Sequence, residues 1–237
     1  MISPISRKHP VYQDDNGVIY PSVTQILSIV NKPFLVNWAN NLGLKGIAVQ
    51  DANKESTDVG TLTHAFIEGH ITREEVSTDG YSRGTVDQAL FCYEGYLIWE
   101  EKYHPTYIET EKSFISKEHG YAGTIDAVCK IGGQQYILDW KTSASIYPEY
   151  VSQVVAYRLG IGKTGIGWGD SGNGCHVGIV RLFKDSTSPG YQFARFRSSI
   201  LTLYALDFFM ECKNLWNEKV KMESAWKQAQ KDGFDGD

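Results

Sequence analysis

The sequence contains no apolar run long enough to cross a membrane, and its first residues form no apolar signal segment. It also lacks an excess of positive charge: the formal net charge is −5, so the chain as a whole does not attract nucleic acid. We therefore expect a cytoplasmic protein that makes no membrane contact. Any binding to nucleic acid would have to depend on a local patch.

Cysteine is scarce and scattered. Cys92, Cys129, Cys175 and Cys212 include no CxxC-type pair of the kind that holds zinc or an iron–sulfur cluster. We interpret all four as buried or free thiols, although spacing alone leaves open a cluster assembled from distant cysteines.

The chain has 237 residues, of which 42% are hydrophobic and 22% charged, as in an ordinary folded domain with a sizeable core. We expect one domain, 1–237, with a helical part at about 20–104, a sheet with a helix at about 105–200, and a carboxy-terminal helix at about 199–229. The element order predicts an α/β fold in which a central mixed sheet of about five strands is flanked by helices. The expected helices are about 22–30, 34–49, 58–71, 86–103, 148–159 and 199–229, the expected strands about 106–115, 120–131, 134–141, 176–184 and 191–197, and the glycine-rich stretch 160–174 a functional loop.

Gly132 and Gly133 lie at the midpoint of two strand-like runs. A Gly-Gly pair in this position predicts a two-residue hairpin turn. Residues that face each other across such a hairpin have numbers with the same sum as the two glycines, and Asp126 and Asp139 meet this condition. Facing residues share one face of the sheet, with Cβ atoms about 4.5–5.5 Å apart, so the two carboxylates would be neighbours.

These two carboxylates indicate a divalent-cation site. Like charges on facing residues destabilise a hairpin, and a cation bound by both removes the conflict. Lys141 shares the face of Asp139 because side chains alternate along a strand, whereas Tyr136, Leu138 and Trp140 point the other way, into a core. The alternative is a pair of solvated surface aspartates beside a lysine.

Two helical segments carry further polar candidates. His64 offers an imidazole as a third ligand for an ion such as Mn²⁺, and Glu68 lies on the same helical face. Gln153 and Tyr157, also four residues apart, follow the Asp139 strand, where their polar ends could touch a substrate. Taken singly, each has a simpler interpretation as a hydrogen-bonded helix histidine, a surface glutamine or a half-buried tyrosine.

Four motifs thus follow one another along the chain: His64, Gly123-Thr124-Ile125-Asp126, Asp139-Trp140-Lys141-Thr142 and Gln153-x-x-x-Tyr157. Together, over about residues 20–200, they resemble the motifs of the PD-(D/E)XK nuclease superfamily in its RecB-type branch, near the phage exonucleases and the mitochondrial genome maintenance exonuclease. The resemblance implies a restriction-endonuclease-like core and metal-dependent hydrolysis of phosphodiester bonds.

The resemblance also implies roles for individual residues. His64, Asp126, Asp139 and the backbone carbonyl of Trp140 would hold Mg²⁺ or Mn²⁺. Lys141 would orient or activate the attacking water, either with a depressed pKa or as a fixed positive charge, so that Asp126, Asp139 and Lys141 form the catalytic set.

Other positions are assigned by the same resemblance. Thr142, Gln153 and Tyr157 would contact the substrate, while Glu68 and Glu111 are candidates for supporting contacts to the ligands. Relatives that bind an iron–sulfur cluster carry three cysteines near the carboxy terminus. This chain has only Cys212 there, so no cluster is expected.

A local excess of basic residues lies in the last two predicted strands. Arg195 and Arg197 would alternate onto one face with Tyr191 and Phe193, a mixture suited to backbone contact and base stacking. The alternative is a sheet edge with ordinary solubilising charges.

We therefore predict a metal-dependent DNA exonuclease or end-processing nuclease of phage or bacterial repair, recombination or replication, acting on single-stranded DNA or duplex ends. Two alternatives use the same fold: a structure-specific endonuclease, and a catalytically silent DNA-binding relative. The sequence predicts no particular oligomeric state.

Overall fold

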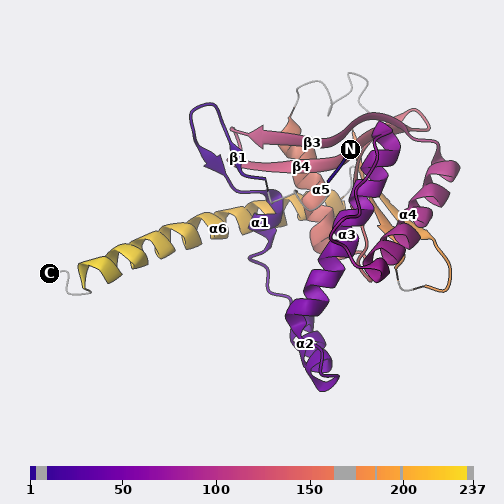
Figure 1. Ribbon diagram of the computed structural model, residues 1–237. Helices are drawn as coiled ribbons and strands as arrows, with labels where there is room; N and C mark the ends of the chain where they lie inside the picture. The colour runs from indigo at the N-terminus through magenta and orange to yellow at the C-terminus, as the bar shows by residue number, and fades with distance from the viewer. Residues whose placement is uncertain (4–9, 163–174, 185, 198–199, 234–237) are drawn as a thin grey trace.

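The computed structural model describes residues 1–237 except 4–9, 163–174, 185, 198–199 and 234–237. Its centre is a five-stranded sheet in the order β3-β4-β5-β6-β7 (Figure 1). Neighbouring strands are antiparallel except β5 and β6, which are parallel. The prediction of an α/β fold with a mixed five-stranded sheet is confirmed. The strands are β3 (Thr106–Ser116), β4 (Tyr121–Ile131), β5 (Gln134–Lys141), β6 (His176–Leu182) and β7 (Tyr191–Phe196).

Six helices and a small hairpin surround the sheet in the described part of the chain. They are β1 (Tyr12–Gln13), β2 (Ile19–Tyr20), α1 (Val23–Leu27), α2 (Phe34–Leu44), α3 (Val49–Thr72), α4 (Arg83–Tyr103), α5 (Pro148–Ile161) and α6 (Ile200–Asp232). The predicted loop 160–174 lies outside the described residues from position 163 onward, as do residues 234–237 of the predicted tail.

Helix α3 begins nine residues before the predicted start at Asp58. Residues 49–57 include several good helix formers, and Lys54 makes an ion pair of 2.6 Å with Asp58 one turn on. Asp58 is therefore an interior residue of the helix and not its cap. The cap of α4 is Ser82, whose side chain accepts a hydrogen bond from the Thr85 amide.

Each face of the sheet buries a separate core. Helices α1, α5 and α6 pack on one face around residues such as Ile125, Ile137 and Phe209. Helices α3 and α4 pack on the other face, where Trp99 and Trp140 meet edge to face with ring centroids 5.3 Å apart. Tyr136, Leu138 and Trp140 all belong to this second core, which confirms the face predicted for them.

The hairpin between β4 and β5 has the predicted turn and register. Gly132 and Gly133 have φ angles of +56° and +79°, in the left-handed region that a two-residue turn requires. The paired residues run from Ile131 with Gln134 to Ala127 with Leu138. The ladder then ends, while β5 continues beside β6 as far as Lys141. Asp126 and Asp139 therefore lie at the point where β5 leaves its antiparallel neighbour.

All four cysteines are buried free thiols, as predicted. Among the described residues, no helix is long and apolar enough to span a membrane.

Candidate active site

Three metal-ligating side chains converge where the β4–β5 ladder ends. His64 of α3, Glu111 of β3 and Asp126 of β4 each offer one ligand atom, and these atoms lie within 4.8 Å of one another. All three residues are partly buried. An imidazole nitrogen with two carboxylate oxygens is a donor set that suits Mn²⁺ or Mg²⁺.

Glu111 lies opposite Asp126 on the neighbouring strand, because Thr110 pairs with Ala127 and Lys112 pairs with Ile125 on either side. Its φ angle is +48°, a left-handed conformation inside a β-strand. A side chain other than glycine adopts this region at a free-energy cost of about 1–3 kcal/mol, and such strain gathers at functional sites.

The contacts of His64 fit a cation between its ring and Asp126. Nε2 lies 3.1 Å from the Trp140 carbonyl oxygen, which can only accept, so Nε2 carries the proton and donates it. Nδ1 of the neutral ring is then an acceptor, and it lies 3.6 Å from Oδ2 of Asp126. Two acceptors facing each other are favourable only when a positive charge, a proton or a metal ion, lies between them. The residues present therefore fit a divalent cation.

Asp126 also holds the end of β5 in place. Its Oδ2 accepts a hydrogen bond of 2.7 Å from the Trp140 amide, where the backbone ladder has stopped. His64 donates a hydrogen bond to the Trp140 carbonyl. The backbone amide and the backbone carbonyl of Trp140 are therefore both held by side chains of the cluster.

Asp139 belongs to an adjoining network of buried polar groups. It is 1% exposed, and its Oδ1 accepts a hydrogen bond of 2.8 Å from Nε2 of Gln153. Nζ of Lys141 lies 2.6 Å from Oδ2, an ion-pair contact that lacks the alignment of a regular hydrogen bond. Gln153 also donates to the Tyr157 hydroxyl at 2.7 Å. The second predicted carboxylate is thus held by α5 and by its own strand.

Burial and charge act in opposite directions on this ion pair. Burial raises the pKa of Asp139 to about 6, although Lys141 partly offsets it. Burial alone would lower the pKa of Lys141, but the nearby Asp139 and Asp126 carboxylates outweigh it, so the pKa is raised. Of the two roles predicted for Lys141, this direction favours a fixed positive charge.

The structure groups the predicted ligands differently from the sequence prediction. His64 and Asp126 lie in the cluster, where Glu111 is the third member, whereas Asp139 contacts Lys141 and Gln153. Glu68 lies one turn after His64 and is not one of the three. The sequence assigned Glu111 only a supporting contact, and its position follows from the β3–β4 register, which no local motif indicates.

The other predicted substrate contacts lie at different distances from the cluster. The Thr142 hydroxyl packs against Gly60 of α3, close to His64 in the chain. Arg195 lies on β7, two strands from β5, and pairs with Gly178, whereas Lys141 pairs with Arg181 nearer the other end of β6. The structure therefore does not bring Arg195, or Arg197 beyond it, next to the cluster.

The aromatic residues of β7 pack inward. The rings of Phe193 and Tyr103 have centroids 5.0 Å apart, and the Arg195 guanidinium lies 5.5 Å from the Phe193 ring. Tyr191 likewise contacts Tyr103. Because these rings pack against the core beside α4, they are not placed to stack on bases. Only the arginine charges of this strand could then contact a nucleic acid.

A cavity of about 390 Å³, lined by several residues that carry hydroxyl groups, adjoins Glu111. Tyr12 of the amino-terminal hairpin closes one side, and its hydroxyl lies 2.9 Å from Oγ1 of Thr124. Gly123 leaves room for Tyr157 here, because a Cβ atom would lie 2.8 Å from that ring. No sequence motif indicates Tyr12, which reaches the site from a distant part of the chain.

No protein-family model matches this sequence, and no curated protein matches it. Among solved structures, a presumed exonuclease from Eubacterium rectale is 14% identical, with a TM-score of 0.43 over 66% of this chain and 64% of that one. LHK-Exo in complex with dAMP is 13% identical, with a TM-score of 0.37 over 75% and 91%. SSO0001 is also 13% identical, with a TM-score of 0.31 over 57% and 62%. These likenesses are too distant to assign an activity, which must be argued from the site.

Proposed function

We propose that this protein is a metal-dependent nuclease of the PD-(D/E)XK superfamily, in its RecB-type branch, that hydrolyses phosphodiester bonds in DNA. The observation that supports this most directly is the convergence of His64, Glu111 and Asp126 within 4.8 Å, beside the buried pair of Asp139 and Lys141. The sequence motifs and the site geometry are consistent with the same chemistry.

His64, Glu111 and Asp126 would hold Mg²⁺ or Mn²⁺, with Asp139 and the Trp140 carbonyl next to them. When bound, the ion neutralises charge on the phosphate and lowers the pKa of a water molecule. Lys141 is kept protonated by Asp139 and supplies a fixed positive charge toward the developing negative charge. Gln153 orients the Asp139 carboxylate through its 2.8 Å hydrogen bond.

The cavity beside Glu111 is the place we assign to the nucleotide next to the cleaved bond. Its volume of about 390 Å³ is within the ordinary range of ligand pockets, and Tyr12, Thr124 and Tyr157 are among the residues that line it. Since the cavity beside the cluster could hold a terminal nucleotide, and the sequence motifs resemble those of exonucleases, we infer an exonuclease or end-processing activity in phage or bacterial DNA metabolism. Arg195 and Arg197 remain predicted contacts to the DNA backbone farther along the sheet.

The proposal is tested with end-labelled linear DNA and a closed circle of the same sequence. We expect the linear substrate to be degraded with Mg²⁺ or Mn²⁺ and left intact with EDTA, and the circle to persist. Cleavage of the circle at a similar rate would indicate the endonuclease alternative. Intact DNA under every metal condition would contradict the proposed hydrolysis and favour a silent DNA-binding protein.

A matched pair of variants on β3 separates the site from its surroundings. Glu111→Gln removes a charge from the cluster, whereas Glu109→Gln removes one that pairs with Lys112 at 2.7 Å on the same strand. We expect Glu111→Gln and Asp126→Asn to lower Mn²⁺ affinity, measured by calorimetry, by about tenfold or more, and Glu109→Gln to leave it unchanged. Lys141→Ala should keep the ion but lose most turnover. Equal Mn²⁺ affinity in the wild type, Glu109→Gln, Glu111→Gln and Asp126→Asn would contradict the assignment of the ligands.

A further inference from the structure

Helix α6 extends well beyond the body of the protein. Its buried residues, Thr202, Ala205, Phe209 and Cys212, all lie in its first half, where it packs against α5 and α1. None of residues 213–232, all of which are described, is buried, and the part beyond Trp216, which still packs against the core, projects as an arm (Figure 1). At the rise of an α-helix, the arm from 217 to 232 is about 24 Å long.

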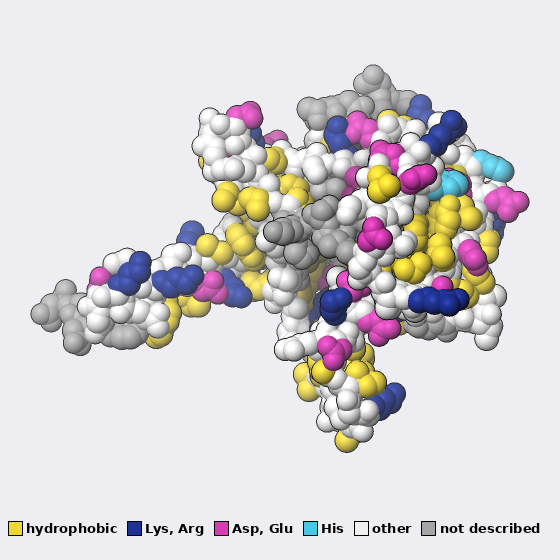
Figure 2. Space-filling model, viewed as in Figure 1, with side chains coloured by type: hydrophobic (Ala, Val, Ile, Leu, Met, Phe, Trp, Pro, Cys, Tyr) yellow, Lys and Arg dark blue, Asp and Glu magenta, His cyan; other side chains and the backbone are white. Residues whose placement is uncertain are grey.

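An apolar stripe runs along α6 on a different side from its buried face. Hydrophobic side chains along the arm lie between charged ones (Figure 2). Along the whole of α6, six apolar side chains, each between 43% and 65% exposed, lie within roughly 40° of their common mean direction around the helix axis. Four of the six are spaced at intervals of seven residues. This α6 stripe consists of Leu201, Tyr204, Phe208, Leu215, Met222 and Trp226.

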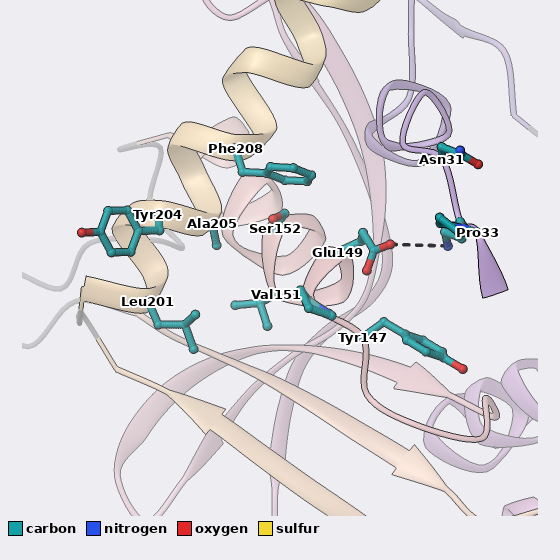
Figure 3. A pocket seen from close by; sticks show the side chains of 12 residues that line it. Asn31, Pro33, Tyr147, Glu149, Val151, Ser152, Leu201, Tyr204, Ala205 and Phe208 are labelled. Atoms are coloured by element: carbon teal, nitrogen blue, oxygen red, sulfur yellow. Dashed lines mark ion pairs between the residues drawn. The ribbon is translucent and has the colours of Figure 1, made fainter.

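The stripe begins in a largely apolar cavity. The cavity has a volume of about 480 Å³, and Leu201, Tyr204 and Phe208 form one of its walls (Figure 3). Val151 of α5 forms part of its floor, and the ion pair of Lys32 with Glu149, at 4.0 Å, lies on its far side. The cavity and the arm therefore form one apolar surface.

We propose that this surface binds α6 of a second copy of the chain, in antiparallel orientation, with the two-fold axis at Leu215. Leu215 then faces the partner's Leu215, Phe208 faces the partner's Met222, and Tyr204 faces the partner's Trp226. Every residue of the stripe except Leu201 meets another residue of the stripe. Trp226 at the tip of each arm reaches the mouth of the other subunit's cavity.

The charges beside the stripe favour this orientation. Glu211 and Lys219 lie one turn before and one turn after Leu215, on the edges of the stripe. In the antiparallel pair, Glu211 faces the partner's Lys219, so opposite charges meet twice. In a parallel pair, each would face its own copy, and like charges would repel.

The area involved is that of a stable interface. At the observed exposures, burial of the five paired side chains removes on the order of 600 Å² per chain, or about 1,200 Å² for the pair, which is the lower end of the range of specific interfaces. A two-fold contact of this kind is self-complementary and closes, so it predicts a dimer and no larger assembly.

The first test measures molar mass by light scattering after size-exclusion chromatography. We expect the wild type to be a dimer at micromolar concentration, and Leu215→Glu and Met222→Glu to be monomers with unchanged helix content by circular dichroism. Val220→Glu is the matched control: Val220 is 39% exposed but points away from the stripe, so this variant should remain a dimer. A monomeric wild type, a trimer, or equal loss of the dimer in Val220→Glu would overturn the proposal.

The second test fixes the orientation by disulfide formation. The native cysteines are buried, so a new cysteine on the stripe is the accessible thiol of each variant. We expect Leu215→Cys to form a disulfide-linked dimer under mild oxidation, and Met222→Cys alone to form none. A mixture of Met222→Cys with Phe208→Cys should cross-link. Cross-linking of Met222→Cys with itself would indicate a parallel pair and would overturn the antiparallel arrangement, whatever the nuclease activity of the protein.

Discussion

Glu111 faces Asp126 across the β3–β4 ladder, and the backbone of Glu111 is left-handed at this point. Two carboxylates and a strained residue therefore meet at one place in the sheet. Each feature lowers the stability of the protein without an ion, and both place oxygen atoms next to His64. The ion proposed above would offset the repulsion between the two carboxylates.

The first prediction follows from this conflict. Replacing Glu111 by glycine removes one charge and permits φ of +48° without strain, so we expect the metal-free protein to gain about 1–2 kcal/mol in free energy of unfolding. The same variant should lose Mn²⁺ affinity. Urea denaturation in EDTA, compared with calorimetry in Mn²⁺, measures the two effects. A variant less stable than the wild type in EDTA would show that Glu111 supports the fold.

The second prediction concerns the ion pair of Lys141 with Asp139. Lys141→Met leaves a carboxylate that is 1% exposed without its cation, and loss of one partner of a buried pair costs about 3–5 kcal/mol. Since the Lys141 side chain is 18% exposed, we expect a smaller cost than for a fully buried pair, about 2–3 kcal/mol. The double variant Lys141→Met with Asp139→Asn should recover most of this stability. Equal destabilisation of the single and double variants would mean that packing of the lysine stem, and not charge, is what matters.

The third prediction is a pH dependence at His176, at the start of β6. Burial lowers the pKa of His176, and the Arg197 and Arg158 charges lower it further, while the Tyr136 ring lies 5.2 Å from the imidazole. A histidine with a lowered pKa stabilises the fold above its unfolded pKa of about 6.5, and this stability is lost as the pH falls. We expect His176→Phe to lose less stability than the wild type between pH 7 and pH 5, as measured by urea denaturation. Parallel losses in the two proteins would contradict the lowered pKa.

The fourth prediction uses two glycines of α4. A Cβ atom on Gly95 would lie 2.5 Å from the backbone oxygen of Gly190, whereas one on Gly84 meets nothing closer than 3.9 Å. Alanine stabilises a helix by about 1 kcal/mol relative to glycine, but a clash with the backbone destabilises the fold by about 1–3 kcal/mol. We expect Gly95→Ala to lower the melting temperature and Gly84→Ala to raise it slightly. A rise in both would show that the β6–β7 connection moves aside easily.

Local patterns were sufficient to predict much of the fold. The Gly132-Gly133 turn determined the β4–β5 register, and alternation along β5 placed Trp140 in the core. Ser22 forms the capping box that begins α1, near the predicted start of that helix. In each case the deciding interaction joins residues close in sequence, so the pattern contains the information needed.

The parts that sequence patterns did not determine depend on distant residues. The position of Glu111 opposite Asp126 depends on an irregularity between Tyr107 and Glu109 that shifts the β3–β4 pairing, and no local pattern indicates its left-handed backbone. Asp139 turns toward Lys141 and Gln153 because α5 packs across the end of β5. Tyr12 arrives from the amino terminus. Alternation along β5 indicates that Lys141 lies beside Asp139, but the contacts of Glu111, Gln153 and Tyr12 join segments far apart in the chain and have no signature in one short stretch.

The two-residue turn at Gly132 also limits how this protein can change. One extra residue in the loop would leave two outcomes, since neighbouring side chains of a strand point to opposite faces. Either β5 rotates and drives Asp139 and Lys141 among the rings of Trp99 and Tyr96, or it slides by one position and the Trp140 amide leaves Asp126. A substitution changes one side chain of β5, whereas a change in the length of this loop would displace all of them at once.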